Sequence, residues 1–123
     1  MGYSVERGAG NNGKPDLIVQ DGKEIGIEVK ACRLFVSNDL EAKVGSFCFH
    51  TDSFIDFIDN CEEEGRGHLV VFVIYGPGTE PVIFSSETEW VRDLLENYSK
   101  NRVSLTIYQV LRGVLDIKRL ISL

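Results

Sequence analysis

Cysteine, long apolar runs and positive charge are scarce in this 123-residue sequence. Its three cysteines are an odd number without C-x-x-C spacing, which excludes a closed disulfide framework and a four-cysteine zinc site. The longest apolar run, residues 69–75, is far shorter than the ~20 residues that a membrane helix needs. The first residues have no signal-peptide apolar core. We therefore expect reduced cysteines and a cytoplasmic protein that does not enter a membrane.

The composition is otherwise that of an ordinary globular protein, with 43% hydrophobic and 26% charged residues. At this length we expect one domain spanning residues 1–123. The net charge of −6 opposes binding to a phosphate backbone. However, residues 51–100 carry eleven Asp/Glu against three Lys/Arg, whereas residues 101–123 carry one against four. The acidic excess is thus local, and the two ends of the chain are compatible with a nucleic-acid partner.

The hydrophobic pattern predicts an α/β domain with a mixed sheet of about five strands flanked by helices. Two antiparallel strands are expected on either side of a two-residue Asp21-Gly22 turn, and a further strand is expected to lead into a helix capped by Thr51 or Asp52. A nearly continuous apolar run predicts a central strand buried on both faces. The expected strands are residues 15–20, 25–31, 45–50, 68–75, 81–85 and 101–107.

A second helix is predicted after the capping box Ser86-Glu87-Thr88-Glu89, with Trp90, Val91, Leu94, Leu95 and Tyr98 on its inner face. Residues 112–123 suit either a helix or a strand. Their apolar side chains predict a buried terminal element or a homodimer interface.

The candidate chemistry lies in the first hairpin. Glu28 and Lys30 are two residues apart and therefore share one face of their strand, whereas Val29 points to the other. A two-residue turn places Asp16 opposite Ile27, and a one-residue bulge would bring it directly beside Glu28. Two converging carboxylates suit Mg²⁺, which completes its coordination with water and substrate phosphate. Together with a lysine, they predict metal-assisted hydrolysis of phosphodiester bonds.

These residues resemble the PD-(D/E)xK signature of the restriction-endonuclease-like nucleases, because Pro15-Asp16 is followed after eleven residues by Glu28-Val29-Lys30. The segments 2–7, 14–19 and 27–31 and the Gly/Asn loop between the first two resemble consecutive pieces of archaeal Holliday-junction resolvases. The resemblance covers residues 2–33 and, beyond them, only the order of elements.

The resemblance implies a restriction-endonuclease-like fold and a DNA endonuclease that uses Mg²⁺, with Mn²⁺ as a substitute. It implies that Asp16 and Glu28 bind the metal together with the Val29 carbonyl, and that Lys30 is the catalytic lysine. Basic residues near this region are candidates for contacting DNA: Arg7, Lys14 and Arg33.

The sequence departs from the resolvases at its beginning, where these enzymes have a preceding helix with an additional glutamate. Three explanations stay open: a shortened chain, a helix supplied by another subunit, or replacement of that glutamate by Glu6.

Ordinary structural roles compete with each functional interpretation. Asp16, Glu28 and Lys30 could form the solvated face of an edge hairpin, but their strand is too apolar for a simple edge. The Gly8–Gly13 loop suits either flexibility or phosphate contact. We interpret His68, at the start of an apolar strand, as structural.

The function that these observations favour is a Mg²⁺-dependent DNA endonuclease, junction-resolving or restriction-like, acting as a homodimer. The alternative is a catalytically inactive nuclease-fold module that binds DNA or a partner protein. A third possibility is a structural subunit that docks through its apolar C-terminal element. The type of nucleic acid and the DNA structure that would be cut stay open.

Overall fold

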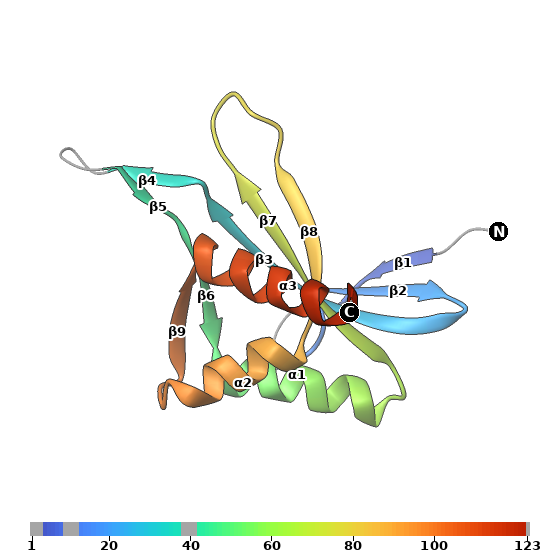
Figure 1. Ribbon diagram of the computed structural model, residues 1–123. Helices are drawn as coiled ribbons and strands as arrows, with labels where there is room; N and C mark the ends of the chain where they lie inside the picture. Colours follow the sequence, from blue (N-terminus) through green and yellow to red (C-terminus); the bar gives the residue numbers. More distant parts are fainter. Residues whose placement is uncertain (1–3, 9–12, 38–41, 123) are drawn as a thin grey trace.

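The computed structural model describes residues 4–8, 13–37 and 42–122. A five-stranded sheet is its largest element, with the spatial order β1-β2-β3-β7-β8 (Figure 1). The β3–β7 pair is parallel and the other pairs are antiparallel, so the sheet is mixed. Its strands are β1 (Ser4–Arg7), β2 (Leu17–Asp21), β3 (Lys23–Arg33), β7 (Gly67–Tyr75) and β8 (Val82–Glu87).

Two shorter antiparallel pairs and three helices complete the described chain. The predicted fold class, an α/β domain with a mixed sheet of five strands and flanking helices, is confirmed. Strand β4 (Phe35–Ser37) pairs with β5 (Ala42–Val44), and β6 (Ser46–His50) pairs with β9 (Arg102–Thr106). The helices are α1 (Thr51–Glu63), α2 (Glu89–Asn97) and α3 (Ile107–Ser122).

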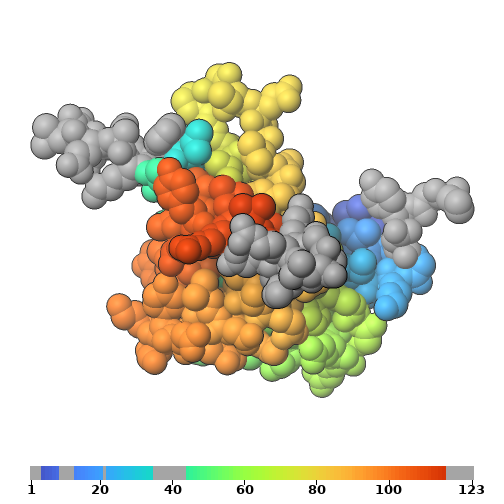
Figure 2. Space-filling model, in the orientation of Figure 1, coloured from blue at the N-terminus to red at the C-terminus, as the bar shows by residue number. Residues whose placement is uncertain are grey.

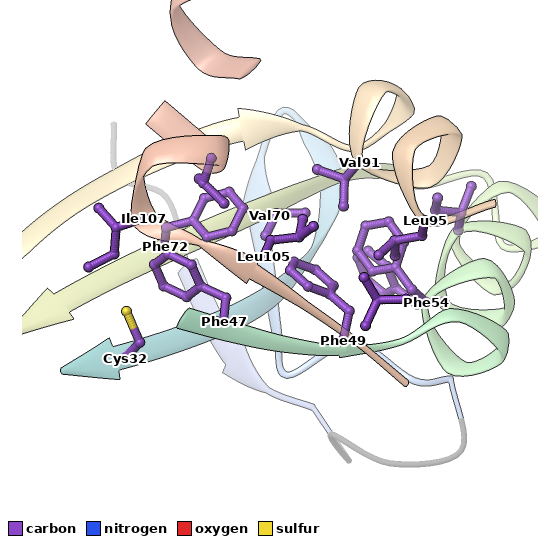
Figure 3. Close-up of a cluster of buried hydrophobic side chains, with 14 of the residues drawn as sticks. Cys32, Phe47, Phe49, Phe54, Val70, Phe72, Val91, Leu95, Leu105 and Ile107 are labelled. Carbon is purple, nitrogen blue, oxygen red and sulfur yellow. The ribbon is translucent and has the colours of Figure 1, made fainter. Parts of the chain in front are cut away.

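The hydrophobic core lies against one face of the five-stranded sheet. Phe47 and Phe49 of β6 are fully buried and meet the ring of Phe72 from β7 in edge-to-face geometry (Figure 3). Helix α1 contributes Phe54 and Phe57 to the same cluster, and α2 contributes Val91 and Leu95. The aromatic residues thus form the core between the sheet and the layer of β6, β9 and helices.

Strand β7 lies between β3 and β8, as expected of an interior strand, but it is not buried on both faces. Val70 and Phe72 are fully buried, whereas the alternate residues Leu69, Val71 and Val73 are only partly buried. The core side chains of β7 all lie at its even-numbered positions, so the described helices pack against only one face of the sheet. The continuous apolar run therefore reflects one packed face and one apolar but partly exposed face.

The helix starts differ from the predicted caps. Helix α1 begins at Thr51, whose hydroxyl donates to the Lys100 carbonyl (2.9 Å), and the Asn101 amide oxygen accepts the Asp52 N–H (3.0 Å). The first turn of α1 is therefore capped by the loop before β9 and not by its own Thr51 or Asp52. Because the capping groups lie about fifty residues away in the chain, no local sequence pattern predicts them.

The predicted capping box before α2 is wrong, because β8 extends through Glu87. The Ser86 hydroxyl accepts a hydrogen bond from Trp90 Nε1 (2.6 Å), and the Thr88 hydroxyl bonds to His68 (2.6 Å). Both hydroxyls that would have capped the helix thus serve tertiary contacts. Tyr98, expected on the inner face, follows the last residue of α2 and is 40% exposed.

The ambiguous end of the chain is helical. Helix α3 covers Ile107–Ser122, and its buried residues Ile107 and Val110 join the core. In the space-filling view, α3 lies on the surface between α2 and the β7–β8 hairpin (Figure 2). No helix in the described part of the chain is long and apolar enough to span a membrane.

Candidate functional site

The first hairpin closes one residue later than the two-residue turn predicts. Asp21 pairs with Lys23 and Leu17 pairs with Ile27, which leaves Gly22 alone at the tip with φ of +73°. A two-residue turn of the expected type needs positive φ at both positions, and Gly22 alone meets this condition. The predicted register is therefore wrong by one residue.

Asp16 lies immediately before β2 and is tied to β3 by two hydrogen bonds. Its N–H donates to the Ile27 carbonyl (2.9 Å), and its Oδ2 accepts the Val29 N–H (2.8 Å). Its carboxyl group is close enough to that of Glu28 for the two to repel each other. The structure therefore brings the two predicted carboxylates together, although through a different strand register.

Lys30 completes the cluster on the core side of β3. Its Nζ lies 4.0 Å from Glu28 Oε1, and both side chains are largely buried, with exposures of 21% for Lys30 and 19% for Glu28. The ammonium also lies over the Phe49 ring, 4.9 Å from its centroid. A cation on the negative face of an aromatic ring is stabilised electrostatically, so Phe49 helps to hold the lysine in this place.

Burial and the neighbouring Asp16 raise the pKa of Glu28 from its usual value of 4.5 to about 7. Desolvation is the largest cause, and repulsion by Asp16 adds to it, whereas the positive charge of Lys30 lowers the pKa. The single positive charge of Lys30 does not compensate for two partly buried carboxylates. A site with this excess of negative charge is suited to a divalent cation.

The chemistry of the donor set fits Mg²⁺. Asp16 and Glu28 offer hard carboxylate oxygens beside the start of β2, beyond which β2 no longer pairs with β3. The N–H and C=O groups of one residue in an extended strand point to the same edge, and the Val29 N–H points to Asp16. The Val29 carbonyl therefore faces the same edge and offers a third oxygen.

The other predicted site residues lie on β1, on β3 and in the segment before β2. Arg7, Lys14 and Arg33 are exposed, with Arg7 opposite Leu17 in the β1–β2 pair and Arg33 at the end of β3. Glu6 is also exposed and pairs with Ile18, and within the described residues it makes no hydrogen bond or ion pair with Asp16 or Glu28. Its role as an additional acid of the site stays a prediction.

The ends of the glycine-rich loop are anchored beside the cluster, whereas its residues 9–12 lie outside the described residues. The Gly8 N–H donates to the Asp16 carbonyl (2.7 Å), and Asn60 Nδ2 of α1 donates to the Gly13 carbonyl (3.0 Å). Asn60, which anchors the loop, and Phe49, which lies under Lys30, were not predicted from the sequence as parts of the site. Their partners are 47 and 19 residues distant in the chain, so no local motif reveals them.

The fold is similar to that of Hjc, a Holliday junction resolvase from the archaeal hyperthermophile Archaeoglobus fulgidus. The similarity covers 88% of this chain and 80% of that chain, with 13% sequence identity and a TM-score of 0.49. No family model matches the sequence, and no curated protein matches it. The case for any activity therefore depends on the residues of the site.

Proposed function

We propose that this chain is a Mg²⁺-dependent endonuclease that hydrolyses phosphodiester bonds in DNA, of the junction-resolving or restriction type. The observation that supports this function is the convergence of Asp16, Glu28 and Lys30 at β3, beside the start of β2. Their arrangement combines two carboxylates, whose mutual repulsion favours a cation, with a fixed ammonium group. Phosphodiester hydrolysis needs both kinds of charge at the reacting phosphorus.

Each residue of the cluster has a distinct role in this proposal. Asp16, Glu28 and the Val29 carbonyl would hold Mg²⁺, which when bound polarises a phosphate oxygen and lowers the pKa of coordinated water. Lys30 orients the attacking water and offsets the negative charge that develops on the pentavalent phosphorus. The Val29 N–H holds the Asp16 carboxylate in place (2.8 Å), so Asp16 needs little reorganisation.

The surrounding cations supply the DNA contacts in this proposal. Arg7, Lys14 and Arg33 are exposed near the strand ends that frame the cluster. Contacts of this kind neutralise phosphates and contribute sequence-independent affinity that falls with salt. They offset the overall negative charge of −6 where the substrate would bind.

The test is cleavage of labelled duplex, single-stranded and four-way-junction DNA with Mg²⁺, Mn²⁺ or EDTA. We expect metal-dependent cleavage that Asp16→Asn, Glu28→Gln and Lys30→Ala each reduce by at least about 100-fold. Lys23→Ala is the matched control, because Lys23 is exposed on the same strand and outside the cluster.

Full cleavage by any of the three variants would contradict the mechanism. Binding of DNA without cleavage under every metal condition would contradict the enzyme and support the inactive nuclease-fold module instead. Equal loss of activity in Lys23→Ala would indicate nonspecific damage to the strand.

A further inference from the structure

A second group of metal-binding side chains lies away from the Asp16–Glu28 pair, where the end of α1 meets the starts of β7 and α2. Glu62, His68 and Glu89 each offer one ligand atom, and these atoms lie within 4.8 Å of one another. The three residues come from three different elements, so the grouping is a product of the tertiary fold. It combines an imidazole nitrogen with carboxylate oxygens.

The His68 imidazole is held in one orientation by a buried partner. Its Nδ1 lies 2.6 Å from Oγ1 of Thr88, which is only 1% exposed. When Nδ1 carries the proton and donates it to this hydroxyl, the lone pair of Nε2 is available to a metal. Metal-binding histidines typically have such an outer hydrogen bond, which sets the tautomer and the ring orientation.

The spacing between two of the three ligand atoms fits a tetrahedral ion. His68 Nε2 lies 3.4 Å from Glu62 Oε1. Zinc–nitrogen and zinc–oxygen bonds of about 2.0–2.2 Å give an edge of roughly 3.3–3.6 Å between two ligands of a tetrahedron. The nitrogen and oxygen are thus already separated as two ligands of one zinc ion would be.

We propose that Glu62, His68 and Glu89 form a zinc site with a fourth position for water. The Glu62 and Glu89 side chains are 57% and 53% exposed, so the ion has an open path to the site. Arg92 Nη2 binds one oxygen of Glu89 (2.6 Å), and a carboxylate has a second oxygen to offer. Zinc here links α1, β7 and α2 and therefore stabilises the folded state.

Nuclear magnetic resonance of the imidazole nitrogens tests this site directly, because the chain contains only two histidines, His50 and His68. We expect a zinc titration of the ¹⁵N-labelled full chain to shift Nε2 of His68 and saturate at one ion, while Nδ1 keeps its proton. The His50 signals should stay unchanged. A titration with Mg²⁺ should leave both histidines unchanged, because Mg²⁺ prefers an oxygen shell.

Substitutions of exposed residues on α1 and α2 test the site without disturbing the core, so that a loss of zinc binding is not caused by misfolding. Glu62→Gln and Glu89→Gln change exposed residues, and each should raise the zinc dissociation constant about 10–100-fold. The double variant Glu63→Gln/Glu96→Gln, which removes two neighbouring exposed acids, should bind zinc like the parent protein. Because the readout is His68 itself, zinc bound at Asp16 and Glu28 does not imitate the expected result.

Two outcomes would overturn the proposal. The first is an unchanged His68 signal up to about 1 mM zinc, which corresponds to an affinity too weak for a built site. The second is an equal His68 shift in the parent protein and in Glu62→Gln/Glu89→Gln. Neither outcome bears on the nuclease, whose test is DNA cleavage.

Discussion

At the scale of single residues, the placement of Glu28 has the clearest physical consequence. Its carboxyl group is largely buried beside Asp16, and Lys30 compensates only in part. A carboxyl group whose pKa is raised in the folded state favours folding while it is protonated and opposes folding once it is ionised. The same excess of negative charge that favours a divalent cation thus lowers stability near neutral pH.

The first prediction concerns this effect of pH on Glu28→Gln. The stability that the protonated Glu28 contributes is fully present below its usual pKa of 4.5 and is lost as pH rises to about 7. Without added metal, the variant should therefore gain about 2 kcal/mol over the parent protein between pH 4.5 and 8, after allowance for partial exposure. Urea unfolding across this range measures the difference, and a pH-independent difference would contradict it. The exposed Glu63→Gln variant is the control and should follow the parent protein.

The second prediction concerns the ring beneath the lysine. Phe49→Leu removes the aromatic face under Lys30 and keeps an apolar side chain in the core. Loss of a cation–π contact worth about 1 kcal/mol should lower single-turnover DNA cleavage by roughly tenfold or less, beyond any effect on folding.

Phe54→Leu is the matched control for this variant. Phe54 is also buried and meets the Phe49 ring at 5.4 Å, so it belongs to the same aromatic cluster. Both variants should be similarly destabilised in thermal unfolding, and only Phe49→Leu should slow cleavage at a temperature where both are folded. Equal cleavage rates in the two variants would exclude a positioning role for Phe49.

At the scale of elements, close packing between helices decides where α3 lies. Gly113 of α3 faces the Trp90 ring of α2, and a Cβ atom at Gly113 would come within 2.4 Å of Trp90 Cζ3. Because the ring leaves no room for a side chain, Gly113 allows α3 to approach α2 closely. Helix propensity alone would favour alanine here by about 1 kcal/mol.

The third prediction uses the opposite signs of these two effects. Gly113→Ala should lower the free energy of unfolding by about 1–3 kcal/mol, because overpacking against Trp90 outweighs the gain in propensity. In a Trp90→Leu background, the same change should be neutral or stabilising. A double-mutant cycle by chemical unfolding measures the coupling. Stabilisation of the parent protein by Gly113→Ala would show that α3 does not pack on Trp90.

At the scale of the whole molecule, apolar side chains are left uncovered on α3. Tyr108, Leu111 and Leu115 recur at helical spacing, with exposures of 68%, 38% and 61%. Helix α3 lies on the surface in Figure 2, and an adjacent face of the helix packs on the core through Ile107 and Val110. A helix that is apolar on two sides favours association with a second apolar surface.

The fourth prediction is that this stripe forms the homodimer interface expected from the sequence. Sedimentation velocity should detect a dimer at about 10–100 µM, and Leu115→Glu should weaken association at least tenfold, because it buries a charge in an apolar contact. Val82→Glu is the control, since Val82 is 56% exposed on β8 and lies outside the stripe. A parent protein that stays monomeric, or equal effects of the two variants, would contradict an interface on α3.

The sequence by itself determined the class of fold and the candidate residues. Period-two and helical patterns located β3, β6, α1 and β7 to within two residues at most ends, because those patterns directly reflect which side chains face the core. The spacing of Glu28 and Lys30 placed them on one strand face for the same reason, and Asp16 followed from the hairpin.

Only the tertiary structure decided the features that depend on distant contacts. The register of the first hairpin depends on a turn at Gly22 alone. The hydroxyls of Ser86 and Thr88 hydrogen-bond to Trp90 and His68 and do not cap α2. The last residues of the chain, whose pattern suits a helix or a strand, form α3, which packs on Trp90. The raised pKa of Glu28 and the grouping of His68 with two glutamates also arise from burial and from elements that meet in space. Local sequence encodes the periodicity of side chains, whereas desolvation and long-range hydrogen bonds exist only after the chain has folded.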